Sequence, residues 1–322
     1  MNIQNSSKAQ QNMQALWNQA GMILVLIILF IICSLFVDSF FTLRNMKGLA
    51  LSISLTGMIA CPMLFCLALG QLDLSVGSVV ACSGVAAAVV MKMTSSIALG
   101  IGGGIAVGIL AGLVNGYAIA YLRLNALIAT LAMLQIVRGL AYIIANGKAV
   151  GIIEPRFFVL GTSSLLYIPV PVWITFITML IYTFLLNKTS FGRNVLAIGG
   201  NEEAARLAGV PVERVKMWVY ILTSVTTAIA GVILASRMTS GQPMTAQGLE
   251  LTVISACVLG GVSLTGGIGK ISYIIAGVLI LGIVENAMNL IGINPFYQYV
   301  ARGSILMIAV ILDTYKQKSV KD

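Results

Sequence analysis

The sequence predicts an all-α integral membrane protein: a polytopic helical bundle of about ten transmembrane helices, one or two of them broken or re-entrant. Of its 322 residues, 59% are hydrophobic and only 9% are charged, whereas soluble domains carry about 25% charged residues. Ten apolar stretches suggest the spans: 21–37, 49–69, 74–91, 97–121, 124–145, 169–187, 215–236, 250–264, 271–292 and 299–312. Most approach the roughly 20 residues that a span needs, but 250–264 is short and glycine-rich, as in a broken or re-entrant helix.

The polar segments around these stretches are short, which predicts a single transmembrane domain over 20–314 with tails at 1–19 and 315–322. No small-residue cleavage site follows the first stretch, which favours a retained span over a signal peptide. An even number of spans places both tails and the loop 188–214 on one face. That face carries the larger share of lysine and arginine, so the positive-inside rule makes it cytoplasmic.

Composition excludes several kinds of site. The absence of histidine removes histidine metal sites and Ser-His triads. The five cysteines lie in apolar stretches without a CxxC pair, as small buried hydrophobes do. The net charge of +9 comes from cations scattered over short loops, so no nucleic acid is expected as a partner. We expect no catalytic residue, no metal and no cofactor in this chain.

Glycine patterns mark two further features. The span 97–121 has glycine at every fourth position from 100 to 116, which predicts either close helix packing or a surface that slides during function. LGQLDLSVG at 69–77 is echoed by LGGVSLTGG at 259–267, and both interrupt an apolar helix. A duplication and chance similarity both explain this echo.

A few polar residues lie within or beside the apolar stretches, where a charge is costly and must face the bundle interior. They form either a structural network or the lining of a hydrophilic path, and Arg138 and Glu285 are candidates for an ion pair. Asp73 is interpreted as the cap of a helix that begins at a membrane break, rather than as a direct ligand. The set is Asp73, Asn115, Arg138, Glu285, Asn286 and Asn289.

NEEAARLAGV at 201–210 is a short polar segment of the second half, with three charges within five residues. Asn201 is a good N-cap, and Glu202 and Glu203 fall in the first turn, where the helix dipole favours anions. Gly209 suits the position after the helix, and Pro211 prevents its continuation. So short a helix is marginal alone. It is either a segment that docks into a partner or an ordinary solvated loop helix.

Glu203-Ala204-Ala205 followed by Gly209 resembles the EAA loop of ATP-binding cassette importer permeases. GQLDLSVGS (70–78), RLNALIATL (123–131) and VRG (137–139) resemble the ribose-type sugar permeases of that class, although Gln71 replaces a glycine usual there. The stretches 235–271 and 284–290 are most similar to L-arabinose permeases within this family. The resemblance implies a coupling helix that binds the ATPase through Asn201, Glu202, Glu203, Ala204, Ala205, Arg206 and Gly209.

The resemblance further implies a permease subunit in the bacterial inner membrane that translocates a monosaccharide, with L-arabinose as the expected cargo. Its expected partners are a separate ATPase subunit that binds the ATP, a periplasmic sugar-binding protein, a second permease chain and membrane lipid. The sequence lacks GxxxxGK[ST], so the chain itself has no P-loop for ATP. The alternative function is a proton-coupled secondary transporter of a small polar solute. An intramembrane enzyme fits less well, because the usual catalytic sets are missing.

Overall fold

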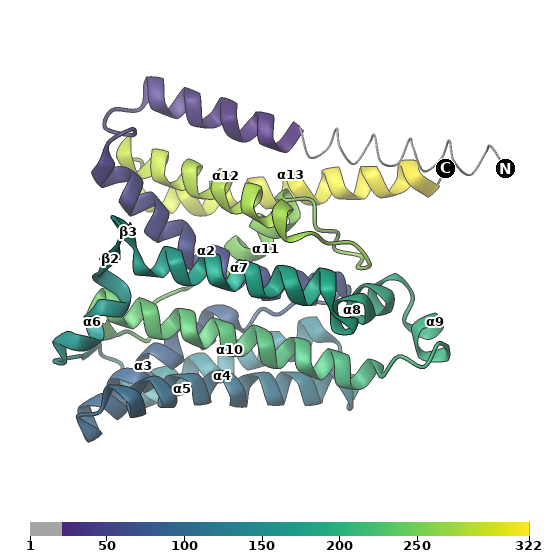
Figure 1. The fold of residues 1–322 in the computed structure, drawn as a ribbon, viewed down its shortest axis with the longest axis horizontal. Helices are drawn as coiled ribbons and strands as arrows, with labels where there is room; N and C mark the ends of the chain where they lie inside the picture. The colour runs from purple at the N-terminus through teal and green to yellow at the C-terminus, as the bar shows by residue number, and fades with distance from the viewer. Residues whose placement is uncertain (1–20, 322) are drawn as a thin grey trace.

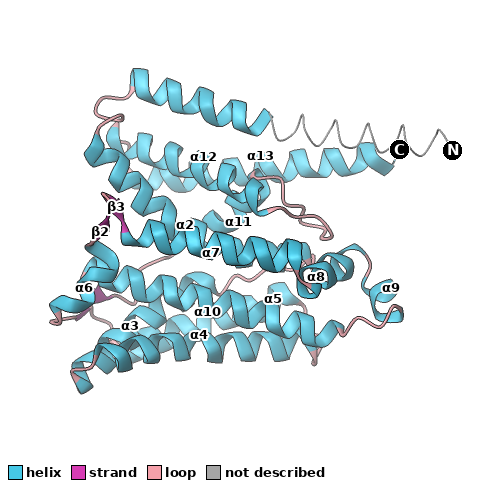
Figure 2. Ribbon diagram, viewed as in Figure 1, coloured by secondary structure: helices cyan, strands magenta, loops and turns pink. Residues whose placement is uncertain are grey.

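The computed structural model describes residues 21–321, which fold as a helical bundle with four two-residue strands (Figures 1 and 2). An apolar helix, Gly21–Phe36, comes first. The later helices are α2 Leu43–Ala68, α3 Val76–Thr94, α4 Ile97–Ala120, α5 Ala126–Ile144, α6 Pro155–Thr162, α7 Val170–Lys188, α8 Ser190–Gly200, α9 Glu202–Leu207, α10 Val212–Met238, α11 Leu249–Leu259, α12 Ile271–Leu290 and α13 Pro295–Lys321.

Among the described residues, 7 helices are long and apolar enough to cross a membrane: α2, α3, α4, α5, α7, α10 and α12. Gly21–Phe36 and α11 are apolar but shorter. The all-helical membrane fold is thus confirmed, while the expectation of about ten spans is not. The stretch expected at 250–264 contains α11, which ends at Leu259 before a glycine-rich connection, and the helix expected at 49–69 begins at Leu43.

Backbone contacts explain the glycine stripe of α4. A Cβ added at Gly112 would lie 2.7 Å from the Ile221 Cα atom of α10, and one at Gly104 would lie 2.8 Å from the Ser83 carbonyl of α3. Gly108 and Gly116 face α10 in the same way. The stripe therefore packs α4 tightly against its neighbours, which is how small residues promote helix association in lipid.

The two ends of the bundle differ in character. In Figure 1, α8, α9 and the C-terminal end of α13 lie at one end, and α6 with β2 and β3 lies at the other. At that second end β1 (Val150–Gly151) pairs antiparallel with β4 (Ser240–Gly241), and β2 (Ser164–Leu165) pairs with β3 (Ile168–Pro169). The β1–β4 pair fastens the α5–α6 connection to the α10–α11 connection, whereas β2 and β3 form a hairpin between α6 and α7. The α8–α9 end remains helical and polar.

The two glycine-containing breaks lie against each other near α8. The Gly267 N–H donates to the Ala68 carbonyl over 2.9 Å. A Cβ added at Gly70 would lie 3.3 Å from the Thr265 carbonyl oxygen, and one at Gly199 of α8 would collide with the Ala68 carbonyl. The end of α2, residues 265–267 of the second break and the end of α8 thus meet backbone to backbone.

Candidate functional site

The structure forms the short helix expected from NEEAARLAGV as α9. Asn201 is its N-cap, with extended backbone, and the Asn201 Oδ1 atom accepts the Ala204 N–H over 2.9 Å. Gly209 has φ +81° and its N–H donates to the Arg206 carbonyl over 3.0 Å, while Val210 N–H reaches the Ala205 carbonyl over 3.0 Å. Because residues with a Cβ resist this left-handed conformation, glycine ends the helix here at low cost.

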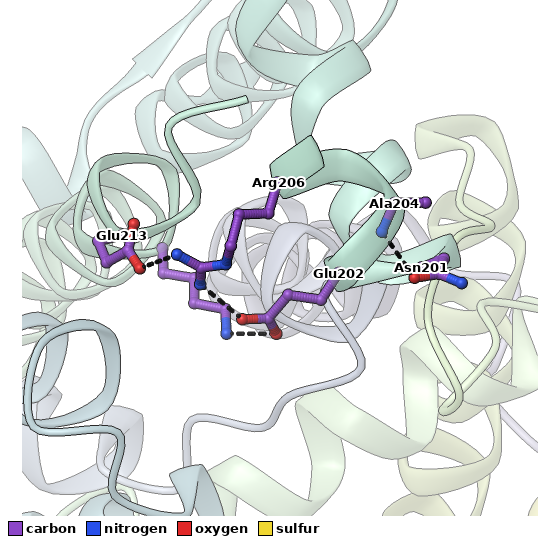
Figure 3. Close-up of polar contacts among 6 residues, drawn as sticks. Asn201, Glu202, Ala204, Arg206 and Glu213 are labelled. Carbon is purple, nitrogen blue, oxygen red and sulfur yellow. Dashed lines mark hydrogen bonds and ion pairs between the residues drawn. The ribbon is translucent and has the colours of Figure 1, made fainter. Parts of the chain in front are cut away.

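Ion pairs attach α9 to the first turns of α10 (Figure 3). Arg206 lies between Glu213, at 2.5 Å, and Glu202, at 3.5 Å. The other Glu202 carboxylate oxygen accepts from Lys216 Nζ over 2.7 Å. The hydrogen bond with Glu213 raises the pKa of Arg206, so this guanidinium stays charged. Solvent-exposed ion pairs such as those of Arg206 stabilise a fold only weakly. Their main effect is to fix the orientation of α9.

These contacts distinguish the two glutamates that the resemblance assigns to ATPase binding. Glu202 is engaged within its own chain by Arg206 and Lys216. Glu203 forms no ion pair with any residue in the described part of the chain and is exposed. Leu207 is 87% exposed one turn later. The exposed surface of α9 therefore includes the Glu203 carboxylate and the apolar side chain of Leu207, next to the small exposed residues Ala204 and Ala208.

A polar hollow of about 470 Å³ lies beside the ion pairs. Glu202, Arg206, Glu213 and Lys216 form one wall, and the remaining walls come from 70–72 and from 119–127. The hollow thus separates α9 from the break between α2 and α3 at the polar end of the bundle.

Tyr220 connects α10 to that same break. It is fully buried one turn beyond Lys216. Its hydroxyl lies 3.2 Å from Gln71 Oε1 and 3.4 Å from the Leu72 carbonyl. A continuous set of contacts consequently runs from α9 through the start of α10 to residues 71 and 72.

The break continues into a buried polar group around Asp73. Asp73 Oδ1 accepts the Ser75 N–H over 2.9 Å and the Ser75 hydroxyl over 2.6 Å. Asn115 of α4 donates in turn to Ser75 Oγ over 3.0 Å. The expected capping role of Asp73 is wrong in detail, because Ser75 is the N-cap of α3 and Asp73 binds this N-cap residue. All three side chains are buried, so the group joins α3 to α4.

The remaining intramembrane candidates do not join this group. Arg138 donates to the Pro243 and Thr245 carbonyls over 2.7 Å each, so it is not the partner of Glu285. Glu285 pairs with Arg302 of α13 at 2.6 Å. Asn286 exchanges hydrogen bonds with Asn45 of α2, and Asn289 accepts from Gln298 of α13. The six predicted residues form separate local contacts instead of one network.

Sequence reasoning missed α8 and the roles of Glu213 and Lys216. Lys216 entered only as one of the cations in the topology argument, and Glu213 was not singled out. Both residues lie in the first turns of a long apolar helix, a few residues after a short helix that carries Glu202 and Arg206. Charges of opposite sign at this spacing indicate ion pairing between the two helices. No group of three or more potential metal ligands occurs within residues 21–321.

Comparison with known proteins places this sequence in a family. A model described as "branched-chain amino acid transport system / permease component" matches residues 45–310. The L-arabinose transport system permease protein of Escherichia coli K12 is 64% identical over 94% of this chain and 93% of its own. The L-arabinose ABC transporter permease protein of Azospirillum brasilense is 53% identical over 97% and 92%, and the ribose import permease protein of Bacillus subtilis is 41% identical over 92% of each chain.

No solved structure matches the chain. The family match covers most of the described helices, from the first turn of α2 into α13. It includes α9, the ion pairs with α10 and the Asp73 group. The chain therefore belongs to this family of transport-system permease components.

Proposed function

We propose that the chain is the membrane subunit of an ATP-driven importer that carries L-arabinose across the bacterial inner membrane. The names of the relatives at 64% and 53% identity support the cargo. In this assignment the chain has no cofactor of its own, and a separate ATPase subunit binds the ATP. A periplasmic sugar-binding protein delivers the sugar, and two permease chains assemble in the lipid bilayer.

The observation that carries the proposal is the presentation of α9. A six-residue helix has little stability of its own, yet it is held in one orientation by the Arg206–Glu213 and Glu202–Lys216 ion pairs to α10. Its outward residues, Glu203 and Leu207, are exposed. A partner with a basic rim and an apolar recess fits this surface, as the coupling cleft of an ATPase would.

The proposed topology has about ten crossings. It adds Gly21–Phe36, the segment 242–259 containing α11, and α13 to the helices that meet the length criterion. Both tails and α9 then face the cytoplasm. Gly151→Cys should react with an impermeant thiol reagent added to intact cells, whereas Ala208→Cys should be protected; the described native cysteines are buried and give little background. Reaction of Ala208→Cys would contradict this orientation.

Two substitutions on α9 test the coupling role. Gly209→Val forces a β-branched residue into φ +81°, and Glu203→Lys reverses the free outward charge. We expect normal membrane insertion, weakened co-purification of the ATPase in detergent and strongly reduced sugar uptake. Gly200→Ala is the control, because nothing lies within 4 Å of an added Cβ there. If both mutants retain the ATPase and couple its hydrolysis to uptake, α9 is not the coupling element.

A further inference from the structure

The connection between β4 and α11, residues 242–248, lies beside the apolar helix α3 without being helical itself. Gly241 lies against Gly84 and Val85 of α3, whereas Ala246 and Glu250 lie against Gly77 near the start of α3. Residues 242–248 therefore lie beside α3 from Gly84 to Gly77, about two helical turns, before α11 begins. Non-helical backbone at membrane depth occurs only where protein buries it or where it lines a water-filled cavity.

This segment is only partly covered by its own chain. Arg138 satisfies the Pro243 and Thr245 carbonyls, but Met244 is 64% exposed and Gln247 is also exposed. Glu250 interacts electrostatically with Arg138, which balances the charge. Arg138 is thus engaged within the chain, while one Glu250 carboxylate oxygen is buried without a hydrogen-bond partner among the described residues. The exposed side chains of the segment, Met244 and Gln247, carry no charge, and Gln247 offers a polar amide.

The neighbouring face of α5 is divided into two stripes. Gln135, Arg138 and Tyr142 are spaced i, i+3 and i+7, so they lie on one side of the helix. Gln135 is exposed, and the other two are half-buried. A second exposed stripe consists of Ile136, Leu140 and Ile143, at 57%, 46% and 72% exposure. The apolar stripe of Ile136, Leu140 and Ile143 is suited to contact with lipid. The stripe of Gln135, Arg138 and Tyr142, beside residues 242–248, carries polar groups that lipid cannot satisfy.

We propose that Gln135, Tyr142 and Gln247 form a sugar-contacting surface of the aqueous route, next to the non-helical segment 242–248. Their amides and hydroxyl offer donors and acceptors without net charge, which suits the hydroxyl groups of a neutral monosaccharide. Arg138 acts as a positioning residue, because it holds the segment by donating hydrogen bonds to the Pro243 and Thr245 carbonyls. The inference rests on the proposed importer function and assigns residues within it.

Cysteine accessibility in the assembled transporter tests the surface. Gln135→Cys and Gln247→Cys should react with a membrane-impermeant thiol reagent, and Ile136→Cys, on the apolar stripe, should not. L-arabinose supplied with the binding protein and ATP should slow labelling of the first two severalfold. Labelling no faster than that of Ile136→Cys, or labelling unaffected by sugar, would overturn the assignment.

Uptake by apolar variants gives a second readout. Gln135→Leu and Gln247→Leu should co-purify with the ATPase and retain its basal hydrolysis, yet reduce arabinose uptake by about tenfold, because each removes hydrogen bonds to the cargo. Ile136→Ala should transport at the wild-type rate. Wild-type uptake by both Leu variants would overturn the proposed sugar-contacting surface but not the proposed importer function. A wild-type complex that takes up no arabinose on ATP hydrolysis overturns the proposed function instead.

Discussion

The break after α2 and the break after α11 have similar sequences and the same local turn, but different surroundings. Asp73 accepts the N–H and hydroxyl of Ser75, and at the matching positions Ser263 Oγ accepts the Thr265 N–H over 3.2 Å and lies 2.9 Å from its hydroxyl. Ser75 is fully buried and α3 follows at once, whereas Thr265 is exposed and α12 begins only at Ile271.

The comparison shows how one turn serves two purposes. The first break starts a helix inside the bundle, so its polar groups need partners from the protein, including Asn115. The second break runs across the end of α8 and is held by backbone contacts, such as that of Gly267 with Ala68. Similar sequences are thus held by side-chain hydrogen bonds in the first break and by backbone packing in the second. This likeness does not distinguish duplication from chance.

The largest expected effect comes from Gly199→Ala, which attacks the contact between the two breaks. The added methyl group would collide with the Ala68 carbonyl and approach the Gly267 nitrogen, both backbone atoms. We expect a loss of about 3 kcal/mol of stability, at the upper end for overpacking, and loss of transport. Reaction of the buried native cysteines with a thiol dye during heating in detergent measures unfolding.

Gly200→Ala is the matched control for that experiment, because its added Cβ meets nothing within 4 Å. It should unfold and transport as the wild-type chain does. Equal stability of the two variants would show that the breaks are not packed as described.

The next largest effect is expected at Asp73. Asp73→Ala leaves the buried Ser75 N–H and hydroxyl without their acceptor, at a cost of about 2 kcal/mol. Ser263→Ala should cost less than about 1 kcal/mol, because water can reach the exposed Thr265. Asp73→Asn retains an acceptor oxygen and should lie close to the wild type. The same thermal assay ranks the variants, and a larger effect at Ser263 would reverse our comparison.

The smallest effect is expected from Gln71→Gly, which makes the first break more like the second. It removes the 3.2 Å bond to Tyr220, but the Leu72 carbonyl remains 3.4 Å from the same hydroxyl. We expect a change below about 1 kcal/mol and near-normal uptake. Tyr220→Phe, which removes both bonds, is the stronger comparison variant. Uptake abolished by Gln71→Gly alone would assign Gln71 a direct role in transport.

Local signals predicted α9 well. Asn201 and Gly209 act within one turn of the helix, so their effects can be read from neighbouring residues. The helix α8 was missed, since its sequence SFGRNVLAIGG carries three glycines and no N-terminal acid. Its stability comes from packing: Val195 and Ile198 are buried in the core.

Partners distant in the sequence were the main source of error. Arg138 and Glu285 are the conspicuous charges within spans, which made them natural candidates for a pair. The actual partners depend on the path of 242–248 beside α5 and on the contact of α12 with α13. Neither arrangement follows from periodicity or capping, because both are set by which helices become neighbours.

The glycine stripe of α4 has a mechanical consequence. The stripe brings α4 into backbone contact with α10 at Gly108, Gly112 and Gly116, over more than two turns. Close-packed surfaces of this kind do not shear without opening gaps, so we expect the two helices to move as one rigid body. A displacement applied to α9, which is joined to the start of α10, would then tilt the two helices as a unit. Movement at the start of α10, where the ion pairs with α9 lie, would displace the other end of α10, where β4 holds the α10–α11 connection. The displacement would thus cross the full thickness of the bundle.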